Sequence, residues 1–139
     1  MEKKFDLEDR LVDFSARIID VVEALPNTRA GNYLAGQLIR CGISPALNYG
    51  EAQAAESIDD FIHKLKIVVK ELKETRTCLK LIRKKQMINP IKKLELIFTE
   101  NEELIAILSK SIDTAKKNKL LAADKNVNTS KVISVNSSR

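Results

Sequence analysis

The amino-acid sequence predicts an all-α protein: an antiparallel up-down-up-down four-helix bundle followed by a disordered C-terminal tail. The 139 residues include only 4 Gly and 3 Pro, which leaves few turns, and 44% of the residues are hydrophobic. Apolar residues recur at alternating steps of three and four, which is the spacing of one helix face. The connections between these periodic segments are only a few residues long, so consecutive helices must lie side by side and antiparallel.

Four segments carry the helical period. They predict helices at about residues 6–25, 28–55, 57–87 and 90–118, and together one bundle domain over residues 1–118. Capping signals agree with these starts, because Asp6 and Ser57 are suited to N-cap positions and Pro90 suits the first turn of a helix. From residue 119 the period dissolves into a polar sequence, which predicts the disordered tail over residues 119–139.

The second predicted helix is irregular. It contains Pro45 and all four glycines of the chain, at a cost of roughly 1 kcal/mol for each glycine and about 3 kcal/mol for the proline. Such a composition indicates close helix packing around a bend. The alternative is a partly unwound segment that exposes the polar groups of Arg40, Asn48 and Glu51.

Two predicted helices carry a second set of apolar residues outside the main stripe. A helix that is apolar around much of its circumference must be buried on more than one side. We therefore expect self-association, the alternative being that these residues widen the core of one subunit. The off-stripe residues are Ile62, Val69, Cys78 and Leu81 on the third helix, and Leu96, Ile97, Leu104 and Ile107 on the fourth.

Basic residues concentrate on the third predicted helix. The chain has a net charge of +5, but residues 1–60 and 94–115 are net acidic, whereas residues 61–93 hold 11 basic and 2 acidic side chains. At about 100° per residue, seven basic residues fall within roughly 140° of arc and extend over about 27 Å. This basic ridge consists of Lys66, Lys70, Lys73, Arg76, Lys80, Arg83 and Lys84.

Two interpretations of the basic ridge remain open. It could follow the phosphates of a structured RNA or DNA, without sequence specificity because no exposed aromatic residues are interleaved with it. It could instead pair with the acidic helices of the same or a neighbouring subunit, which agrees with the zero net charge of residues 1–115. The first interpretation predicts a nucleic-acid-binding protein, and the second predicts a structural or protein–protein interaction module.

The sequence offers little for catalysis. His63 is the only histidine, which excludes multi-histidine zinc sites and paired Glu-x-x-His di-iron sites. Asp59 lies four residues before His63, and two ligands without a third make a poor metal site. Cys41 and Cys78 are expected to be free thiols in apolar surroundings, where the pKa of a thiol rises and its reactivity falls. We therefore expect no enzyme activity, metal or cofactor.

The N-terminal residues lack the apolar core of a signal peptide, and no apolar run reaches the length of a membrane-spanning helix. We therefore expect a cytoplasmic protein with no membrane partner.

One motif carries a resemblance to a known family. The spacing Gln37-x-x-Arg40-x-x-x-Ser44-x-x-x-Asn48-x-x-Glu51, together with the sequence that begins the third helix, resembles the bacterial four-helix-bundle family named for proteins encoded in intervening sequences of 23S ribosomal RNA genes. The similarity covers roughly residues 5–115. It assigns these five motif residues a structural role.

The resemblance implies an antiparallel four-helix subunit that assembles into a homopentamer. The family is also similar to the accessory protein of diversity-generating retroelements, a basic pentamer that binds RNA and a reverse transcriptase. By that analogy, the basic residues of the third helix would contact nucleic acid, and a reverse transcriptase would be a further partner.

Overall fold

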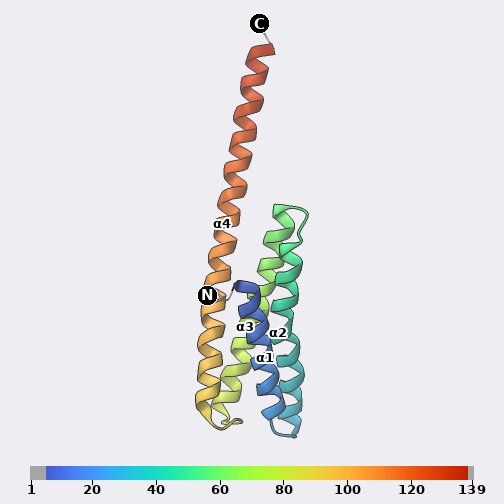
Figure 1. Cartoon of the computed structure of the whole chain (residues 1–139), viewed down its shortest axis with the longest axis vertical. Helices are drawn as coiled ribbons and strands as arrows, with labels where there is room; N and C mark the ends of the chain where they lie inside the picture. The colour runs from blue at the N-terminus through green and yellow to red at the C-terminus, as the bar shows by residue number, and fades with distance from the viewer. Residues whose placement is uncertain (1–5, 138–139) are drawn as a thin grey trace, which may run out of the picture.

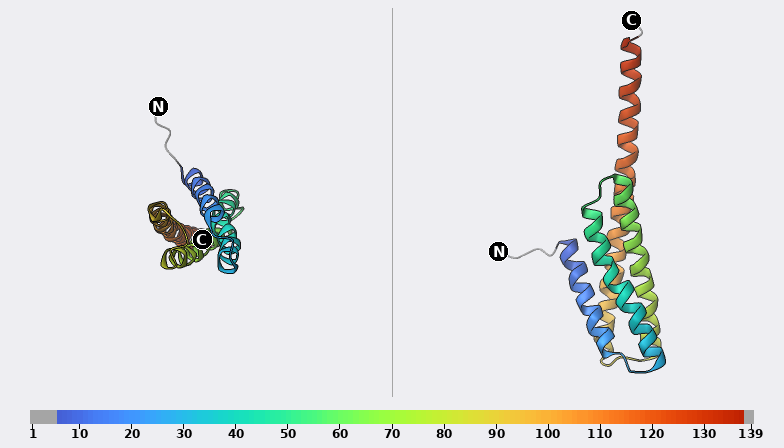
Figure 2. Two further views of the ribbon diagram at one scale, coloured as in Figure 1. Left: turned by 90° about the horizontal axis from the view of Figure 1, so that it is seen from below. Right: turned by 90° about the vertical axis from the view of Figure 1, so that its right-hand side faces the viewer.

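Four α-helices form the part of the chain that the structure describes. The computed structural model describes the backbone of residues 6–137 and the side chains of residues 6–128. In chain order the helices are α1 (Leu7–Ala24), α2 (Arg29–Gln53), α3 (Ile58–Lys84) and α4 (Ile91–Ser137). Successive helices run in opposite directions and pack side by side, and α1 also contacts α4 (Figure 1 and Figure 2). The predicted all-α up-down-up-down bundle is confirmed.

The predicted N-caps of α1 and α3 are in place. Asp6 Oδ1 accepts a hydrogen bond from the backbone N–H of Asp9 at 2.8 Å. Ser57 Oγ accepts one from the backbone N–H of Asp60 at 3.0 Å. Each side chain satisfies a backbone donor that has no partner within the helix, so the sequence itself determines where these two helices begin.

The core consists of the predicted apolar stripes. Its largest fully buried side chains include Phe14, Leu38, Leu72 and Leu104. Among the described residues, four polar or charged side chains are also buried: Ser15, Glu71, Thr75 and Asn101. Asn101 Nδ2 donates to the carbonyl oxygen of Leu72 at 3.0 Å, which ties α4 to α3 inside the bundle. No helix in the described part of the chain is long and apolar enough to cross a membrane.

Close packing of α2 against α1 depends on Gly42. A Cβ atom at this position would lie 2.5 Å from Cγ2 of Ile18 on α1, so any side chain here would separate the two helices. The Oγ of Ser15 donates to the carbonyl oxygen of Gly42 at 2.9 Å. Pro45 removes the N–H that would bond the carbonyl oxygen of Cys41. The hydrogen bond from Ser15 holds the next carbonyl, that of Gly42, against α1.

The other glycines of α2 differ from one another. A Cβ at Gly31 would lie 1.9 Å from the carbonyl oxygen of Pro26 in the turn between α1 and α2, so this turn requires glycine. At Gly36 and Gly50 a Cβ would meet no atom within 4 Å. Close packing within the subunit therefore explains Gly31 and Gly42 but not Gly36 or Gly50.

The off-stripe apolar residues of α3 and α4 mostly lie inside the subunit. Ile62, Val69, Ile97 and Leu104 are buried, and Cys78 and Ile107 are half-buried. Only Leu81 and Leu96 are exposed, at 48% and 55%. Most of this set widens the core of one subunit, which is the alternative that the sequence left open.

Helix α4 continues well beyond the bundle. Ala115 is the last buried residue among the side chains that the structure describes, and residues 116–128 are all exposed. The backbone nevertheless stays helical to Ser137, as the long red end of α4 in Figure 1 shows. The polar tail predicted from residue 119 thus lies outside the core as far as residue 128, and the backbone of residues 119–137 continues α4. Residues 138–139 of the predicted tail lie outside the described residues. Extension adds one hydrogen bond per residue to a helix already nucleated in the bundle, so it needs no tertiary contact.

The C-terminus of α3 is closed by a residue with a positive φ angle. Gln86 has φ 51°. Its N–H donates to the carbonyl oxygen of Arg83 at 3.1 Å, and the N–H of Met87 donates to that of Ile82 at 3.1 Å. This pair of bonds is the Schellman motif, in which glycine is the preferred residue at the left-handed position.

Replacing Gln86 with glycine is therefore expected to stabilise the protein. Gln86→Gly removes a steric cost of roughly 1 kcal/mol for a side chain in the left-handed region. We expect a gain of about 0.5–1 kcal/mol in the free energy of unfolding, measured by urea denaturation. Gln86→Asn should give a smaller gain and Gln86→Val a loss. Equal stability of all four proteins would contradict this account of the helix end.

Candidate nucleic-acid interface

Five lysines of the basic ridge form a narrow exposed line on α3. At about 100° per residue they fall within roughly 80° of arc, and they extend over about 27 Å. All five are exposed, and none makes an ion pair with any residue whose side chain the structure describes. We call this set the lysine stripe: Lys66, Lys70, Lys73, Lys80 and Lys84.

The two arginines of the basic ridge lie to one side of the lysine stripe and pair with α4. Arg76 makes a bidentate contact with Glu102, with Nε–Oε1 at 2.6 Å and Nη2–Oε2 at 3.1 Å. Hydrogen bonding to Glu102 raises the pKa of Arg76. Arg83 lies 3.6 Å from Glu95, and its guanidinium carbon is 4.7 Å from the ring centre of Phe98. The predicted basic ridge therefore divides into two arginines that pair with α4 and five lysines that make no ion pair with a described residue.

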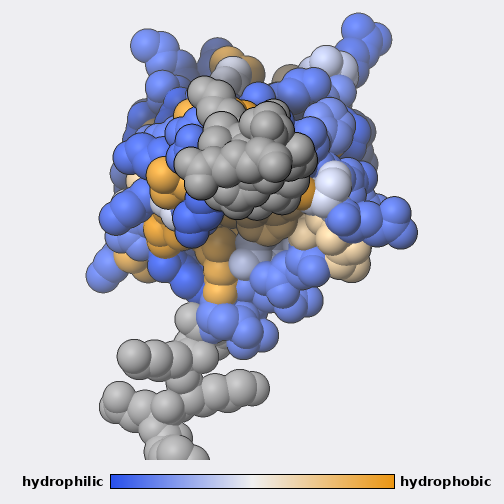
Figure 3. Space-filling model, turned by 90° about the horizontal axis from the view of Figure 1, so that it is seen from above, coloured by the Kyte–Doolittle hydropathy of each residue, from blue (hydrophilic) through white to orange (hydrophobic). Residues whose placement is uncertain are grey.

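Two lysines of α4 lie close to the start of the lysine stripe. Lys66, Lys116 and Lys119 line one pocket of about 440 Å³ together with His63 and Asp59. Lys119 also forms an ion pair with Asp59. The sequence predicted Lys119 to lie in a disordered tail, so it gave no sign of this cluster. The continuation of α4 past residue 118 brings Lys119 close to Lys66 and Asp59. The end of the bundle near this pocket is largely hydrophilic (Figure 3).

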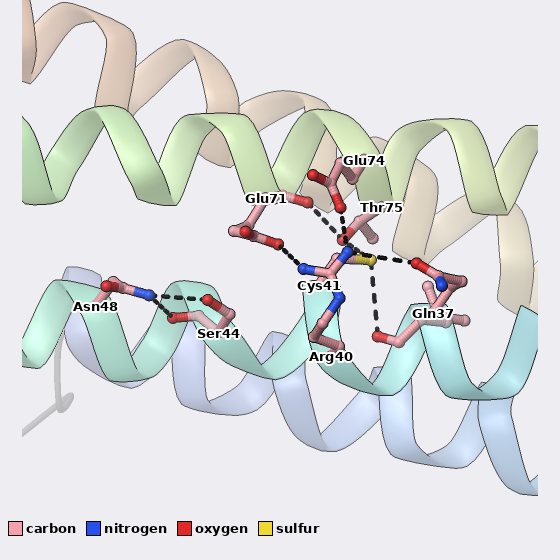
Figure 4. Close-up of polar contacts among 9 residues, drawn as sticks. Gln37, Arg40, Cys41, Ser44, Asn48, Glu71, Glu74 and Thr75 are labelled. Carbon is pink, nitrogen blue, oxygen red and sulfur yellow. Dashed lines mark hydrogen bonds and ion pairs between the residues drawn. The ribbon is translucent and has the colours of Figure 1, made fainter.

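Two family-motif residues of α2, Arg40 and Glu51, pair with residues of α3, and a third, Gln37, bonds to Arg40. Arg40 pairs with Glu71 at 3.0 Å and with Glu74, both on α3 (Figure 4). Hydrogen bonding to Glu74 raises the pKa of Arg40. Gln37 Oε1 accepts a further hydrogen bond from Arg40 at 3.4 Å. Glu51 accepts one from Lys64 of α3 at 2.8 Å.

The remaining motif residues make contacts within α2. Asn48 Nδ2 donates to the carbonyl oxygen and to the Oγ of Ser44, at 3.0 and 2.8 Å (Figure 4). These contacts lie beside Pro45, where the regular hydrogen-bond ladder of the helix is interrupted. The motif thus spans the α2–α3 contact and the part of α2 around Pro45, a placement in keeping with a structural role. The partners of Arg40, Glu71 and Glu74, lie more than thirty residues away in the chain, so the sequence alone gives no signal for these contacts.

The two cysteines are free thiols, as the sequence predicts, but their environments differ. Cys41 is buried, and hydrogen bonding with Cys78 together with burial raises its pKa. Cys78 is half-buried, and the hydrogen bond with Cys41 lowers its pKa to about 7. The expectation of two inert thiols is therefore wrong for Cys78, because sequence reasoning could not show that the thiols are neighbours.

Residues suited to metal binding do not gather in the described part of the chain. No group of three or more His, Cys, Asp and Glu side chains is found there. Asp59, considered from the sequence as a ligand beside His63, instead pairs with Lys119.

Comparisons with known proteins agree with this architecture. Residues 3–110 match the family model described as 23S rRNA-intervening sequence protein. The chain is also similar to a crystal structure, solved at 1.70 Å resolution, of a protein with unknown function from the S23 ribosomal protein family of Bacteroides thetaiotaomicron. The two share 31% sequence identity and a TM-score of 0.71, over 77% of this chain and 98% of that chain. No curated protein matches the sequence.

Proposed function

Since this chain belongs to the 23S rRNA-intervening sequence protein family, we propose that it is a non-enzymatic homo-oligomeric bundle that binds structured RNA or DNA without sequence specificity. The lysine stripe of α3 is the proposed contact surface. Arg76 and Arg83 are not part of it, because both are engaged with α4. The proposed location is the cytoplasm, where such ligands are present.

One observation carries this proposal: the five lysines of the stripe are exposed and unpaired among the described residues. One strand of a duplex carries a phosphate for about every 3.4 Å of helix axis, so a line of about 27 Å parallel to that axis spans roughly eight phosphates. A lysine ammonium is a compact point charge that binds phosphate without reading bases. The side chain of Phe61 is the only aromatic one on α3, so base stacking along the stripe is not expected.

Self-association is the second part of the proposal, with a pentamer as the state that the family resemblance implies. Several large apolar side chains remain exposed on the subunit, including Leu47 at 66%, Leu81 at 48% and Leu96 at 55%. A ring of subunits would cover some of them and repeat the lysine stripe around its circumference. Light scattering should return about five times 15.6 kDa. A mass of one subunit would remove the oligomer from the proposal.

The alternative function is a structural or protein–protein interaction module that binds no nucleic acid. It is supported by exposed acidic residues on α1, among them Asp13, Asp20 and Glu23, which could pair with the lysine stripe of a neighbouring subunit. By the family's analogy with retroelement accessory proteins, a reverse transcriptase is a further protein partner to test. Under this alternative the stripe is hidden in the assembly.

Binding to a mixed pool of structured RNA tests the proposal. Fluorescence anisotropy at low salt should show saturable binding, and unrelated sequences from the pool should bind with similar affinity. The contact is electrostatic and follows the backbone, so no single sequence should be enriched by selection. Absence of binding to both RNA and duplex DNA at low salt would sink the proposal and favour the interaction module.

A further inference from the structure

The only two cysteines of the chain meet at the contact between α2 and α3. Thr75 Oγ1 of α3 donates to Cys41 Sγ of α2 at 3.2 Å. Cys78 follows Thr75 by three residues and therefore lies on the same face of α3, one turn further along. Arg40 and Glu74, which directly precede Cys41 and Thr75 in the chain, form an ion pair that holds α2 and α3 in the same relative position. Cys78 therefore lies beside Cys41 across the contact of α2 with α3, close enough for each thiol to shift the pKa of the other.

The two thiols differ in access and acidity. Cys41 is 1% exposed, whereas Cys78 is only half-buried. The hydrogen bond with Cys41 lowers the pKa of Cys78 to about 7, and Arg40 acts in the same direction, while burial and Glu74 oppose it. The lowered pKa of Cys78 favours its thiolate, the form that reacts with oxidants.

We propose that Cys78 is a peroxide-reactive thiol and that Cys41 resolves its oxidised form into an intramolecular disulfide between α2 and α3. The Cys78 thiolate attacks one oxygen of hydrogen peroxide, breaks the O–O bond and becomes a sulfenic acid, while hydroxide leaves. The sulfur of Cys41 then attacks the sulfur of Cys78. The S–O bond breaks, the Cys41 proton is lost and water is formed. Overall, two thiols and one peroxide give one disulfide and two waters.

This pairing has the features of a redox-sensing thiol with a neighbouring resolving thiol. Disulfides in proteins of reducing compartments are mostly transient and regulatory. The inference is independent of nucleic-acid binding, because neither cysteine lies on the lysine stripe.

Peroxide treatment of the full-length protein tests the proposal. The reduced protein is exposed to hydrogen peroxide at pH 7, alkylated, digested without reduction and analysed by mass spectrometry. We expect a peptide pair joined through Cys41 and Cys78, an intact mass lower by two hydrogens, and no covalent dimer. Thiols that remain reduced under conditions that oxidise free cysteine would overturn the proposal, as would disulfide-linked dimers through Cys78.

Two variants assign the roles of the thiols. In Cys41→Ser the sulfenic acid of Cys78 should persist and be trapped by dimedone. In Cys78→Ser the Cys41 thiol should stay reduced at the peroxide concentration that oxidises the wild type. Oxidation of Cys41 in Cys78→Ser at the wild-type rate would contradict the assignment. Circular dichroism confirms that each variant is folded, and Cys41→Ala replaces Cys41→Ser if the serine variant is not.

The pH dependence of alkylation provides a readout that a merely structural cysteine would not give. The rate at which iodoacetamide modifies Cys78 should rise with a midpoint near pH 7 in the wild type. In Cys41→Ala the hydrogen bond is lost, so the midpoint should move to higher pH, toward the usual value of about 8.5. The same midpoint in both proteins would show that Cys41 does not activate Cys78.

Discussion

The double variant Lys73→Glu/Lys80→Glu is expected to lose at least tenfold in affinity for RNA at low salt. Both lysines are exposed in the lysine stripe and make no ion pair with a described residue. Each reversal removes a phosphate contact and adds repulsion. The plot of log K against log salt concentration should also become flatter by about 2, one for each lysine. Anisotropy titrations over a series of salt concentrations measure both quantities.

A matched control separates the stripe from net charge. Arg29→Glu/Lys110→Glu changes the charge by the same amount at two exposed positions outside the stripe, and it should leave most of the affinity intact. The same proteins are measured by light scattering. If Lys73→Glu/Lys80→Glu dissociates the oligomer while RNA affinity is unchanged, the stripe pairs with a neighbouring subunit, and the interaction module is the correct function.

Alanine at Gly42 and at Gly36 is expected to change stability in opposite directions. In the interior of a helix, alanine is favoured over glycine by roughly 1 kcal/mol. Gly36 has open space around it, so Gly36→Ala should stabilise the protein by about that amount. At Gly42 the new methyl would lie 2.5 Å from Ile18, which is completely buried and has no room to rotate away. Overpacking of this kind costs about 1–3 kcal/mol, so Gly42→Ala should destabilise the protein.

Urea denaturation of the two variants checks this prediction, with each compared to the wild type. A destabilised Gly42→Ala beside a stabilised Gly36→Ala would support direct contact of α1 and α2 at Gly42. If Gly42→Ala were as stable as Gly36→Ala, the close approach of the two helices would be wrong. If Gly36→Ala were destabilising, Gly36 would have to pack against another subunit.

The sequence predicts the fold well because the signals for it are local. Apolar residues at helical spacing mark the buried faces, and Asp6 and Ser57 begin their helices through contacts three residues away. Two features are harder to foresee. The need for glycine at Gly42 comes from Ile18, twenty-four residues earlier. The helical course of residues 119–137 has no apolar period to mark it.

The candidate site is only partly predictable for the same reason. Helical spacing places all seven basic residues on one side of α3, and it does not show which of them face α4. Arg76 and Arg83 pair with carboxylates of α4, whereas no lysine of the stripe pairs with a described carboxylate. In the same way, Cys41 and Cys78 lie far apart in the sequence, so only the packing of α2 on α3 shows that one thiol lowers the pKa of the other.

The salt dependence of RNA binding by the wild-type protein is the most direct test of the central claim, that the lysine stripe is a phosphate-binding surface. Contact of five lysines with phosphates predicts a slope of log K against log salt concentration of about −4.5 for a duplex. Oligomerisation would make the slope steeper. A slope near zero, or no binding at low salt, would contradict the claim.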